Sequence, residues 1–302
     1  MKPGKSIQMC LLACITAVVL WSASFIATKI AYETLAPIQL GFVRTLLAVI
    51  VFWLIRQGTR SRERLDRRDW LRAALSGLLG MTLYFAFENV GVSLTTASNA
   101  ALIVASFPAM TMLLEFVIYK QKPTGQKIIG MVLALAGVAA LTGVDSGESD
   151  NALLGNLCLL GAGVVWAFYN FITRGLSAKY SSMTLTYYQM LTGTVWFVPI
   201  VLWEGAAWEM PTTGSLSAVL FLCLGCSVLA FVLYNYGLKQ LTASVSVSLL
   251  NLVPVLGLLL SVWILDETVT PGQLAGGIVV IIGVVLSTVS FKRSSRKVEL
   301  PQ

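Results

Sequence analysis

The sequence predicts an all-α membrane protein with ten transmembrane helices, arranged as two inverted repeats of five helices each. Composition, the distribution of charge and an internal repeat together predict this class. Of the 302 residues, 57% are hydrophobic and 12% are charged, about half of the charged fraction that is usual in soluble domains. The apolar residues gather in runs of about 20, long enough to cross a hydrocarbon core roughly 30 Å thick. So much apolar surface has to face lipid or other spans.

Ten apolar runs are predicted as spans, and aromatic residues lie near many of their ends, as anchoring at the membrane interface requires. The predicted spans are Ile7–Ile30, Pro37–Ile55, Trp70–Val90, Ala97–Tyr119, Gly125–Gly143, Ala152–Thr173, Met183–Trp203, Leu216–Gly237, Ala243–Leu265 and Gly272–Phe291. Lys2 and Lys5 precede the first run as they would in a signal peptide. That run is too long for a signal peptide and takes part in the repeat, so we interpret it as a retained first span.

The basic residues indicate the orientation of these spans. With ten spans, all 21 lysines and arginines except Lys29 and Arg44 fall at one face, whereas acidic residues such as Asp145 and Glu204 fall at the other. Basic loops stay in the cytoplasm, so both termini of this multi-pass membrane protein are predicted to be cytoplasmic. This placement accounts for the net charge of +7, and nucleic acid is not expected as a partner.

An internal repeat relates the two halves of the chain. The matched positions are Trp21 and Trp166, Arg44 and Gln189, and Phe52 and Phe197 at an offset of 145, then Asn89 and Asn235, Gly91 and Gly237, Pro108 and Pro254, and Gly137 and Gly283 at an offset of 146. The predicted division is residues 1–144 for the first repeat, 145–151 for an external linker, 152–292 for the second repeat and 293–302 for a cytoplasmic tail. Five spans per copy invert the second copy, an architecture typical of alternating access.

Several short motifs, in this order and spacing, resemble those of the drug/metabolite transporter superfamily, specifically its EamA-type ten-span members. They are Leu20-Trp21-Ser22-Ala23-Ser24-Phe25, Phe42-Val43-Arg44, Thr96-Ala97-Ser98-Asn99-Ala100-Ala101-Leu102 before Phe107-Pro108, Thr242-Ala243-Ser244 before Val253-Pro254-Val255, and Asp266-Glu267-Thr268 before Gly272-Gln273. The first copy departs from the pattern, with Lys120-Gln121 where the second has Asp266-Glu267. The resemblance implies an inner-membrane carrier, often an exporter of amino acids or other small metabolites, and does not fix the substrate.

Three ionisable residues inside predicted spans are candidate functional groups, because charges in lipid are costly. Arg44 is either a structural anchor paired with a neighbouring carboxylate or a direct substrate contact. Glu88 is either an interfacial residue or a proton carrier and ligand for a substrate ammonium, so proton coupling is one expectation. Glu115 could instead extend toward the cytoplasmic interface near Lys120.

Polar and aromatic residues in the spans complete the predicted substrate cavity. The candidates are Trp21, Ser24, Arg44, Tyr84, Glu88, Asn89, Asn99, Trp166, Tyr169, Asn170, Gln189, Tyr234, Asn235 and Asn251. The alternative for each amide is hydrogen bonding between helices, and the alternative for each aromatic ring is packing. Family members line their cavity mainly with spans 1, 3, 4, 6, 8 and 9, and the resemblance implies the same here.

Two further features suggest gating hinges and helices that serve for packing. Pro108 and Pro254 occupy equivalent places in spans 4 and 9, where each gives either a static bend or a gating hinge. Spans 5 and 10 carry Gly130, Gly137 and Gly283 and few polar residues, so we interpret them as peripheral packing helices that could also form a homodimer interface.

These observations favour a secondary transporter over an enzyme. The chain has no histidine, its five cysteines fall inside spans, and GxxxxGK[ST] is absent, so no metal, cofactor or ATP site is expected. The predicted cargo is an amino acid or a related zwitterionic or amphipathic compound, moved by alternating access and exported. The alternatives are a carrier for drugs or lipophilic cations and, from another class, a membrane enzyme or a scaffold.

Overall fold

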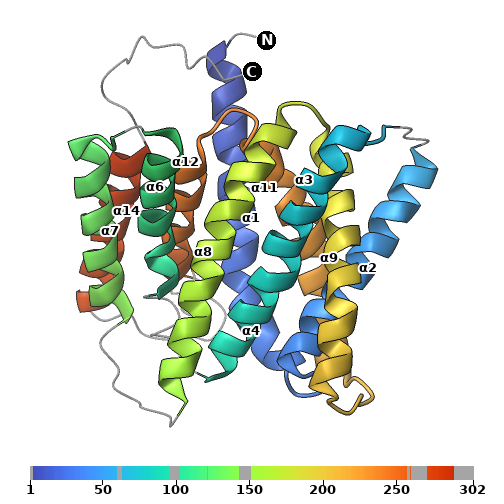
Figure 1. The fold of residues 1–302 in the computed structure, drawn as a ribbon. Helices are drawn as coiled ribbons and strands as arrows, with labels where there is room; N and C mark the ends of the chain where they lie inside the picture. The colour runs from blue at the N-terminus through green and yellow to red at the C-terminus, as the bar shows by residue number, and fades with distance from the viewer. Residues whose placement is uncertain are drawn as a thin grey trace.

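The computed structural model describes residues 3–59, 63–94, 103–120, 122–142, 151–256, 259 and 271–288, and every regular element within these ranges is a helix (Figure 1). In the first half these are α1 (Pro3–Ala31), α2 (Pro37–Gly58), α3 (Arg67–Gly77), η1 (Leu78–Leu83), α4 (Tyr84–Leu94), α6 (Phe107–Tyr119) and α7 (Gly125–Thr142). In the second half they are α8 (Ala152–Ser177), α9 (Ser182–Glu204), α10 (Thr213–Phe221), η2 (Leu222–Leu229), α11 (Ala230–Gly237), α12 (Ala243–Ser248), η3 (Leu249–Asn251) and α14 (Pro271–Thr288).

The helices confirm the predicted class of a multi-span helical membrane protein. Among the described residues, six stretches are long and apolar enough to cross a membrane, namely Ser6–Ala31, Pro37–Gly58, Arg67–Leu94, Leu153–Ser177, Ser182–Glu204 and Thr213–Gly237. Shorter apolar helices cover Ile103–Ile118, Gly125–Ala140, Ala243–Leu256 and Leu274–Ser287. These segments correspond in order to the predicted spans, and the exact count of ten stays a prediction. Most of the predicted linker, residues 145–150, lies outside the described residues.

The two halves run in opposite directions through the bundle. We call the end at which α1 begins the N-terminal face, at the top of Figure 1, and the other end the opposite face. Helix α1 descends from the N-terminal face, whereas its repeat counterpart α8 starts at the opposite face and ascends (Figure 1). The same inversion relates α2 to α9, so matched residues of the two repeats lie at matched depths from opposite faces.

Two π-helical segments occur at equivalent places in the two repeats. Both η1 and η2 interrupt a predicted span, and their last residues, Leu83 and Leu229, are separated by the repeat offset of 146. A π-helical turn is rare and is often found at functional sites, because it rotates the residues that follow out of regular helical register. The next residues include Phe85 and Phe231, so both copies present an aromatic ring just after the π-helix.

Two helix pairs make close contacts that the repeat also relates. On the N-terminal face α1 packs on α11, where Gly237 lies against Cys14 and against the carbonyl of Cys10. On the opposite face α4 packs on α8, where Gly91 lies against Leu159. Small residues at both places let the backbones approach closely, as at other helix contacts in membranes. Each pair joins one helix from each repeat into a unit, α1–α11 or α4–α8.

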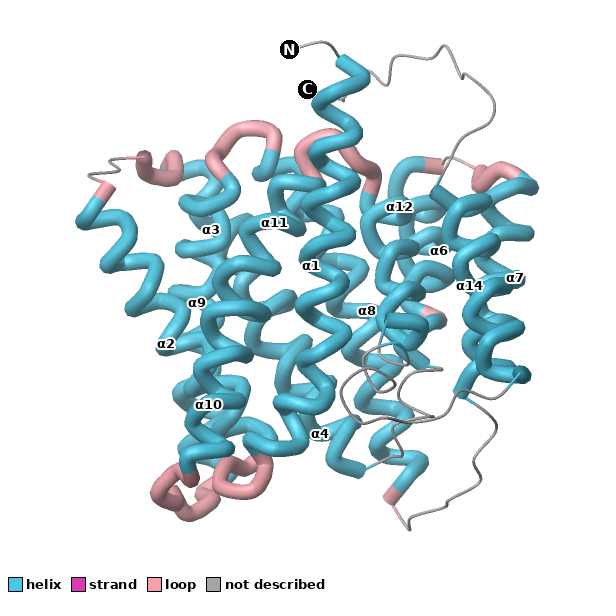
Figure 2. The backbone as a smooth tube through the Cα atoms, turned by 180° about the vertical axis from the view of Figure 1, so that it is seen from behind, coloured by secondary structure: helices cyan, strands magenta, loops and turns pink. Residues whose placement is uncertain are grey.

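The small-residue faces of predicted spans 5 and 10 pack on one another within the chain. Helices α7 and α14 lie side by side at one edge of the bundle in both views (Figure 1, Figure 2). A Cβ atom on Gly137 would lie 2.6 Å from the backbone nitrogen of Val280, and Gly283 faces the backbone of Gly130 and Ala134 just as closely. These glycines therefore serve an intramolecular contact, and a homodimer through the outer faces of the two helices stays a prediction.

A polar cluster links loops of the two repeats at the N-terminal face. The Glu63 carboxylate accepts a hydrogen bond from the backbone N–H of Ser181 at 3.0 Å and another from its hydroxyl. Arg56 donates to Thr184 Oγ1 at 3.0 Å and to the backbone carbonyl of Glu63 at 2.6 Å. Burial alone would raise the pKa of Glu63, but the hydrogen bonds from Ser181 and Thr184 outweigh it and hold that pKa below its ordinary value.

We predict that Gly283→Ala destabilises the protein, because the added Cβ would collide with the backbone of α7. Overpacking of this kind costs about 1–3 kcal/mol. The matched control is Gly175→Ala in α8, where nothing lies within 4 Å of the new Cβ. Thermal unfolding in detergent should show a lower midpoint for Gly283→Ala alone. Equal midpoints for the two variants would contradict the close packing of α7 on α14.

We also predict that Glu63→Gln lowers stability near neutral pH and that this difference fades in acid. Because the folded-state pKa of Glu63 is depressed, its stabilising contribution exists above the unfolded pKa of about 4.3 and is lost as the pH falls through the folded value. Unfolding midpoints of both proteins, measured between neutral and acidic pH, check the sign. A difference that grows in acid would refute it.

Candidate functional site

A single pocket collects residues from both repeats near the middle of the bundle. The space around it measures about 480 Å³ when the gaps between atoms and the open solvent at its mouth are included. Its walls come from α1, α2, α4, α8 and α11, together with a residue just before α6, one in η3 and one just after η3. The lining residues are Trp21, Ser24, Arg44, Tyr84, Phe85, Glu88, Val104, Trp166, Phe231, Leu250 and Val253.

Four aromatic rings form the floor of this pocket, and they are two repeat pairs. The ring centroids of Trp21 and Trp166 are 5.8 Å apart, and those of Phe85 and Phe231 are 5.9 Å apart. Both pairs meet at steep angles, an arrangement that aromatic quadrupoles favour. Trp21 is also fixed by its indole N–H, which donates to the carbonyl of Cys226 at 3.1 Å. The floor is therefore rigid and lies where the two repeats meet.

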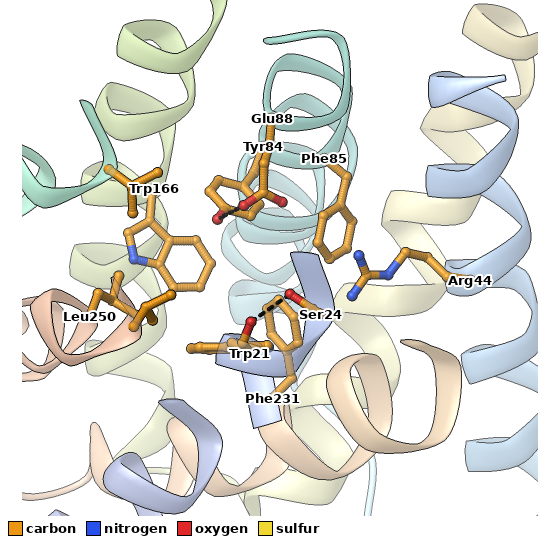
Figure 3. A pocket seen from close by; sticks show the side chains of 11 residues that line it. Trp21, Ser24, Arg44, Tyr84, Phe85, Glu88, Trp166, Phe231 and Leu250 are labelled. Atoms are coloured by element: carbon orange, nitrogen blue, oxygen red, sulfur yellow. Dashed lines mark hydrogen bonds between the residues drawn. The ribbon is translucent and has the colours of Figure 1, made fainter. Parts of the chain in front are cut away.

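Arg44 places a buried cation at one side of the floor. Its side chain comes from α2 and is 3% exposed. The guanidinium donates through Nε to Ser227 Oγ at 2.8 Å, and its central carbon lies 4.1 Å from the centroid of the Phe85 ring. Both contacts stabilise a charge in a dry environment. The terminal amino groups point toward the pocket in Figure 3.

The carboxylate partner that the sequence suggested for Arg44 is not found in the described parts of the chain. The ion pairs there are those of Asp69 with Arg72 and Lys179. Ser227 and Phe85 take the place of the carboxylate, because a hydroxyl and an aromatic face can hold a guanidinium without neutralising it. Within the described residues Arg44 thus has no carboxylate at ion-pair distance, and both of its predicted roles, anchor and substrate contact, stay predictions.

Glu88 brings a carboxyl group into the same pocket. It lies one helical turn after Tyr84 on α4, and the Tyr84 hydroxyl donates to Glu88 Oε1 at 2.6 Å. Figure 3 shows the Phe85 ring between this pair and Arg44, so the two ionisable groups line one space without contacting each other. Ser24 Oγ donates to the carbonyl of Trp21 on its own helix at 2.7 Å. The pocket thus offers one group of each sign above an aromatic floor.

Five of the predicted cavity residues lie outside this pocket, in a buried network toward the N-terminal face. Tyr169 donates to Asn235 Oδ1 at 2.8 Å, and Tyr234 donates to Asn170 Oδ1 at 2.7 Å. Asn235 in turn donates to Gln189 Oε1 at 2.9 Å. All five side chains are 0% exposed, so in this state they join helices and do not face free space.

The remaining candidates fall in different surroundings. Asn89 donates to the carbonyl of Pro37 at 2.9 Å and therefore holds α4 to α2. Asn251 is buried, and its Oδ1 has no hydrogen-bond partner within the described ranges. Asn99 lies outside the described residues. Pro108 follows a break in the helix at Ser106, and Pro254 follows the 3-10 turn η3, so their role as hinges stays a prediction.

Sequence reasoning missed several pocket residues. Phe231 is matched to Phe85, an aromatic residue of a predicted span, at the repeat offset of 146, and that match was a signal that could have found it. Val104 and Leu250 are matched in the same way. No sequence signal identified Ser227, because a serine in a membrane helix usually bonds to its own backbone, whereas this one receives Arg44 from another helix.

A multi-span helical fold with a pocket between two repeats is typical of a polytopic membrane carrier. The chain belongs to the EamA-like transporter family, whose model matches it twice, over residues 8–143 and 153–289. It is 30% identical over 276 residues to a protein of Archaeoglobus fulgidus described as an "uncharacterized transporter", covering 89% of this chain and 93% of that protein.

Two further comparisons agree with this family. A "probable terminal-alkyne amino-acid exporter" of Streptantibioticus cattleyicolor is 28% identical over 276 residues, covering 91% of each protein. A crystal structure matches with a TM-score of 0.75 at 21% identity, covering 92% of this chain and 96% of the other. The second match shows the fold alone. The family and its relatives indicate a transporter, which is not an enzyme.

We predict that Ser227→Ala lowers stability by about 1.5–3 kcal/mol, the contribution typical of a hydrogen bond to a charged group. The variant leaves the Arg44 guanidinium with its Nε partner removed inside a buried site. Ser217→Ala is the matched control, because that exposed hydroxyl bonds only within its own helix. Equilibrium unfolding in detergent measures both. No difference between the variants would contradict the anchoring of Arg44 by Ser227.

Proposed function

We propose that this protein is a secondary transporter that exports a small, net-neutral metabolite, an amino acid or a related zwitterion, across the cytoplasmic membrane by alternating access. The observation that supports this cargo is the pocket, in which Arg44 and Glu88 face one space above four aromatic rings. The N-terminal face would be cytoplasmic, in agreement with the basic residues gathered there.

The two ionisable groups match the two ends of a zwitterion. Ser227 holds only the Nε of Arg44, so the terminal amino groups can receive a carboxylate through parallel hydrogen bonds. Glu88 and the rings of Trp21 and Trp166 can hold an ammonium, by charge and through the negative ring faces. Because the charges of cargo and site then cancel in pairs, binding leaves no unpaired charge in the membrane.

The same geometry argues against the other cargo classes. A lipophilic cation would gain from the aromatic floor and from Glu88, but it would also approach the fixed positive charge of Arg44. A nucleotide or sugar phosphate would need several cations, and Arg44 is the one Lys or Arg that lines the pocket within the described residues. The name of the Streptantibioticus relative, an amino-acid exporter, supports the same class of cargo.

Proton coupling would act through Glu88 in this proposal. Its carboxyl group accepts a hydrogen bond from Tyr84 and lines the pocket, so protonation would remove the charge that meets the substrate ammonium. Proton binding and cargo binding would therefore compete at one site. Such competition makes the carrier an antiporter, in which protons that move inward down their gradient drive the export of cargo.

The proposal is tested by counterflow in proteoliposomes with a panel of radiolabelled neutral L-amino acids. We expect exchange of at least one of them by the wild-type protein. Glu88→Gln should raise the apparent KM about tenfold or more, since a charge-assisted contact is lost, and should flatten the pH dependence. Glu115→Gln is the matched control, because that carboxylate lies on α6 outside the pocket.

Three results would contradict the proposal. One is the absence of counterflow for every neutral amino acid in a preparation that stays folded. Another is tight binding of a sugar phosphate or nucleotide sugar. The third is a complete loss of transport of a permanent cation in Glu88→Gln with no amino-acid exchange in the wild type, which would identify a lipophilic-cation carrier instead.

A further inference from the structure

We infer that Tyr169, Gln189 and Tyr234 form a second half-site, closed in this structure, that receives the cargo when the carrier is open to the N-terminal face. We further infer that the hydrogen bonds of these tyrosines to Asn235 and Asn170 are the gate that keeps this half-site closed. The inference rests on the proposed alternating access and adds to it the residues that the cargo meets first.

The polar residues of the present pocket and the residues of this network occupy equivalent positions in the two repeats. At the repeat offset of 145, Ser24 corresponds to Tyr169 and Arg44 corresponds to Gln189. At the offset of 146, Glu88 corresponds to Tyr234. The aromatic floor maps onto itself, because its members are each other's counterparts. One floor therefore serves two half-sites on opposite sides, and within the described residues the one near Glu88 lines a pocket.

The network joins the two helix units across the space that the cargo would have to pass. Units α1–α11 and α4–α8 are each held by a tight glycine contact. Tyr169 and Asn170 lie on α8, whereas Tyr234 and Asn235 lie on α11, so both tyrosine–asparagine bonds run from one unit to the other. Separation of the units at the N-terminal face has to break these two bonds.

On the other side of the floor the corresponding side chains make no such bond. The bond that joins the two units there is a different one, from the Tyr32 hydroxyl, just after α1, to the backbone carbonyl of Asn89 on α4 at 3.1 Å. Ser24 Oγ donates within α1 at 2.7 Å, and Glu88 accepts within α4 at 2.6 Å. Within the part of the chain that the structure describes, neither side chain bonds to the other unit. The matched side chains therefore bond between the units on the N-terminal side and within their own helices on the other side, which is a difference between two gates of the kind expected in one state of an alternating-access carrier.

The side chains of the closed half-site narrow the class of cargo that it can bind. Two phenolic hydroxyls and one amide supply donors and acceptors but no charge. The counterparts across the floor include the cation Arg44 and the carboxyl group of Glu88. A cargo with a net charge would meet no counter-charge on the N-terminal side. The half-site therefore fits a net-neutral molecule with strong hydrogen-bonding ends.

Side-resolved thiol labelling tests this inference without knowledge of the cargo. In a protein whose five native cysteines are replaced by alanine, a single cysteine is placed at Ser24, in the open pocket, or at Ala230, the buried counterpart of Tyr84. The probe is a membrane-impermeant trimethylammonium methanethiosulfonate, applied to either face. We expect Ser24→Cys to react from the opposite face and Ala230→Cys to react, slowly, from the N-terminal face.

Removing the two tyrosine–asparagine hydrogen bonds of the gate should change the rates at which these two cysteines react. Tyr169→Phe and Tyr234→Phe should each speed the reaction of Ala230→Cys from the N-terminal face by roughly fivefold, the factor expected for one lost hydrogen bond, and should slow that of Ser24→Cys. Tyr236→Phe is the matched control, a tyrosine on the same helix outside the network. If Ala230→Cys stays unreactive from both faces in the double phenylalanine variant, or reacts from the opposite face, the inference is wrong.

Counterflow in the same proteins separates this inference from the proposed function. Labelling that shifts as predicted, without counterflow of any neutral amino acid, supports the gate and overturns the proposed cargo. Counterflow that persists while the labelling of Ala230→Cys never changes supports transport and overturns the second half-site.

Discussion

The structure depends on the placement of one permanent positive charge inside the membrane. A guanidinium near the middle of a span is unfavourable by about 3 kcal/mol or more unless it faces a polar cavity or finds partners. Arg44 meets this constraint with a hydroxyl from η2 and an aromatic face from α4. Its position therefore fixes where α2, α4 and η2 approach one another. Because neither of these contacts carries a negative charge, the space beside Arg44 suits an anionic group.

The repeats explain why a single pocket can be built with so few polar groups. Each repeat supplies one tryptophan and one phenylalanine to the floor, and the π-helical segments η1 and η2 come just before those phenylalanines. The polar residues around this symmetric floor have diverged. One side has Arg44 and Glu88, and the other has Gln189 and Tyr234. This combination of a shared floor and unlike sides allows cargo to be held in chemically different surroundings during one cycle.

Much of the fold follows from the sequence, because lipid forces apolar runs into helices and an odd-numbered repeat forces their inversion. The pocket was predictable in part, since Trp21, Arg44 and Glu88 are costly or bulky residues at matched or isolated positions. The partner of Arg44 was not predictable, because a buried cation suggests a carboxylate partner and no feature of the sequence indicates Ser227. Nor could the sequence separate Tyr84, in the pocket, from Tyr169, in the closed network, since that distinction belongs to the state of the molecule.

Alternating access between the two gates requires that the units α1–α11 and α4–α8 move apart at one face while they approach at the other. Distances between spin labels on the exposed positions Ala178 and Gln240, at the N-terminal face, and Glu33 and Ser93, at the opposite face, report this motion. Pulsed electron resonance in the double variant Tyr169→Phe, Tyr234→Phe should show the first distance lengthened and the second shortened relative to the wild type. Two distances that stay unchanged, or that lengthen together, would contradict the exchange between two gates.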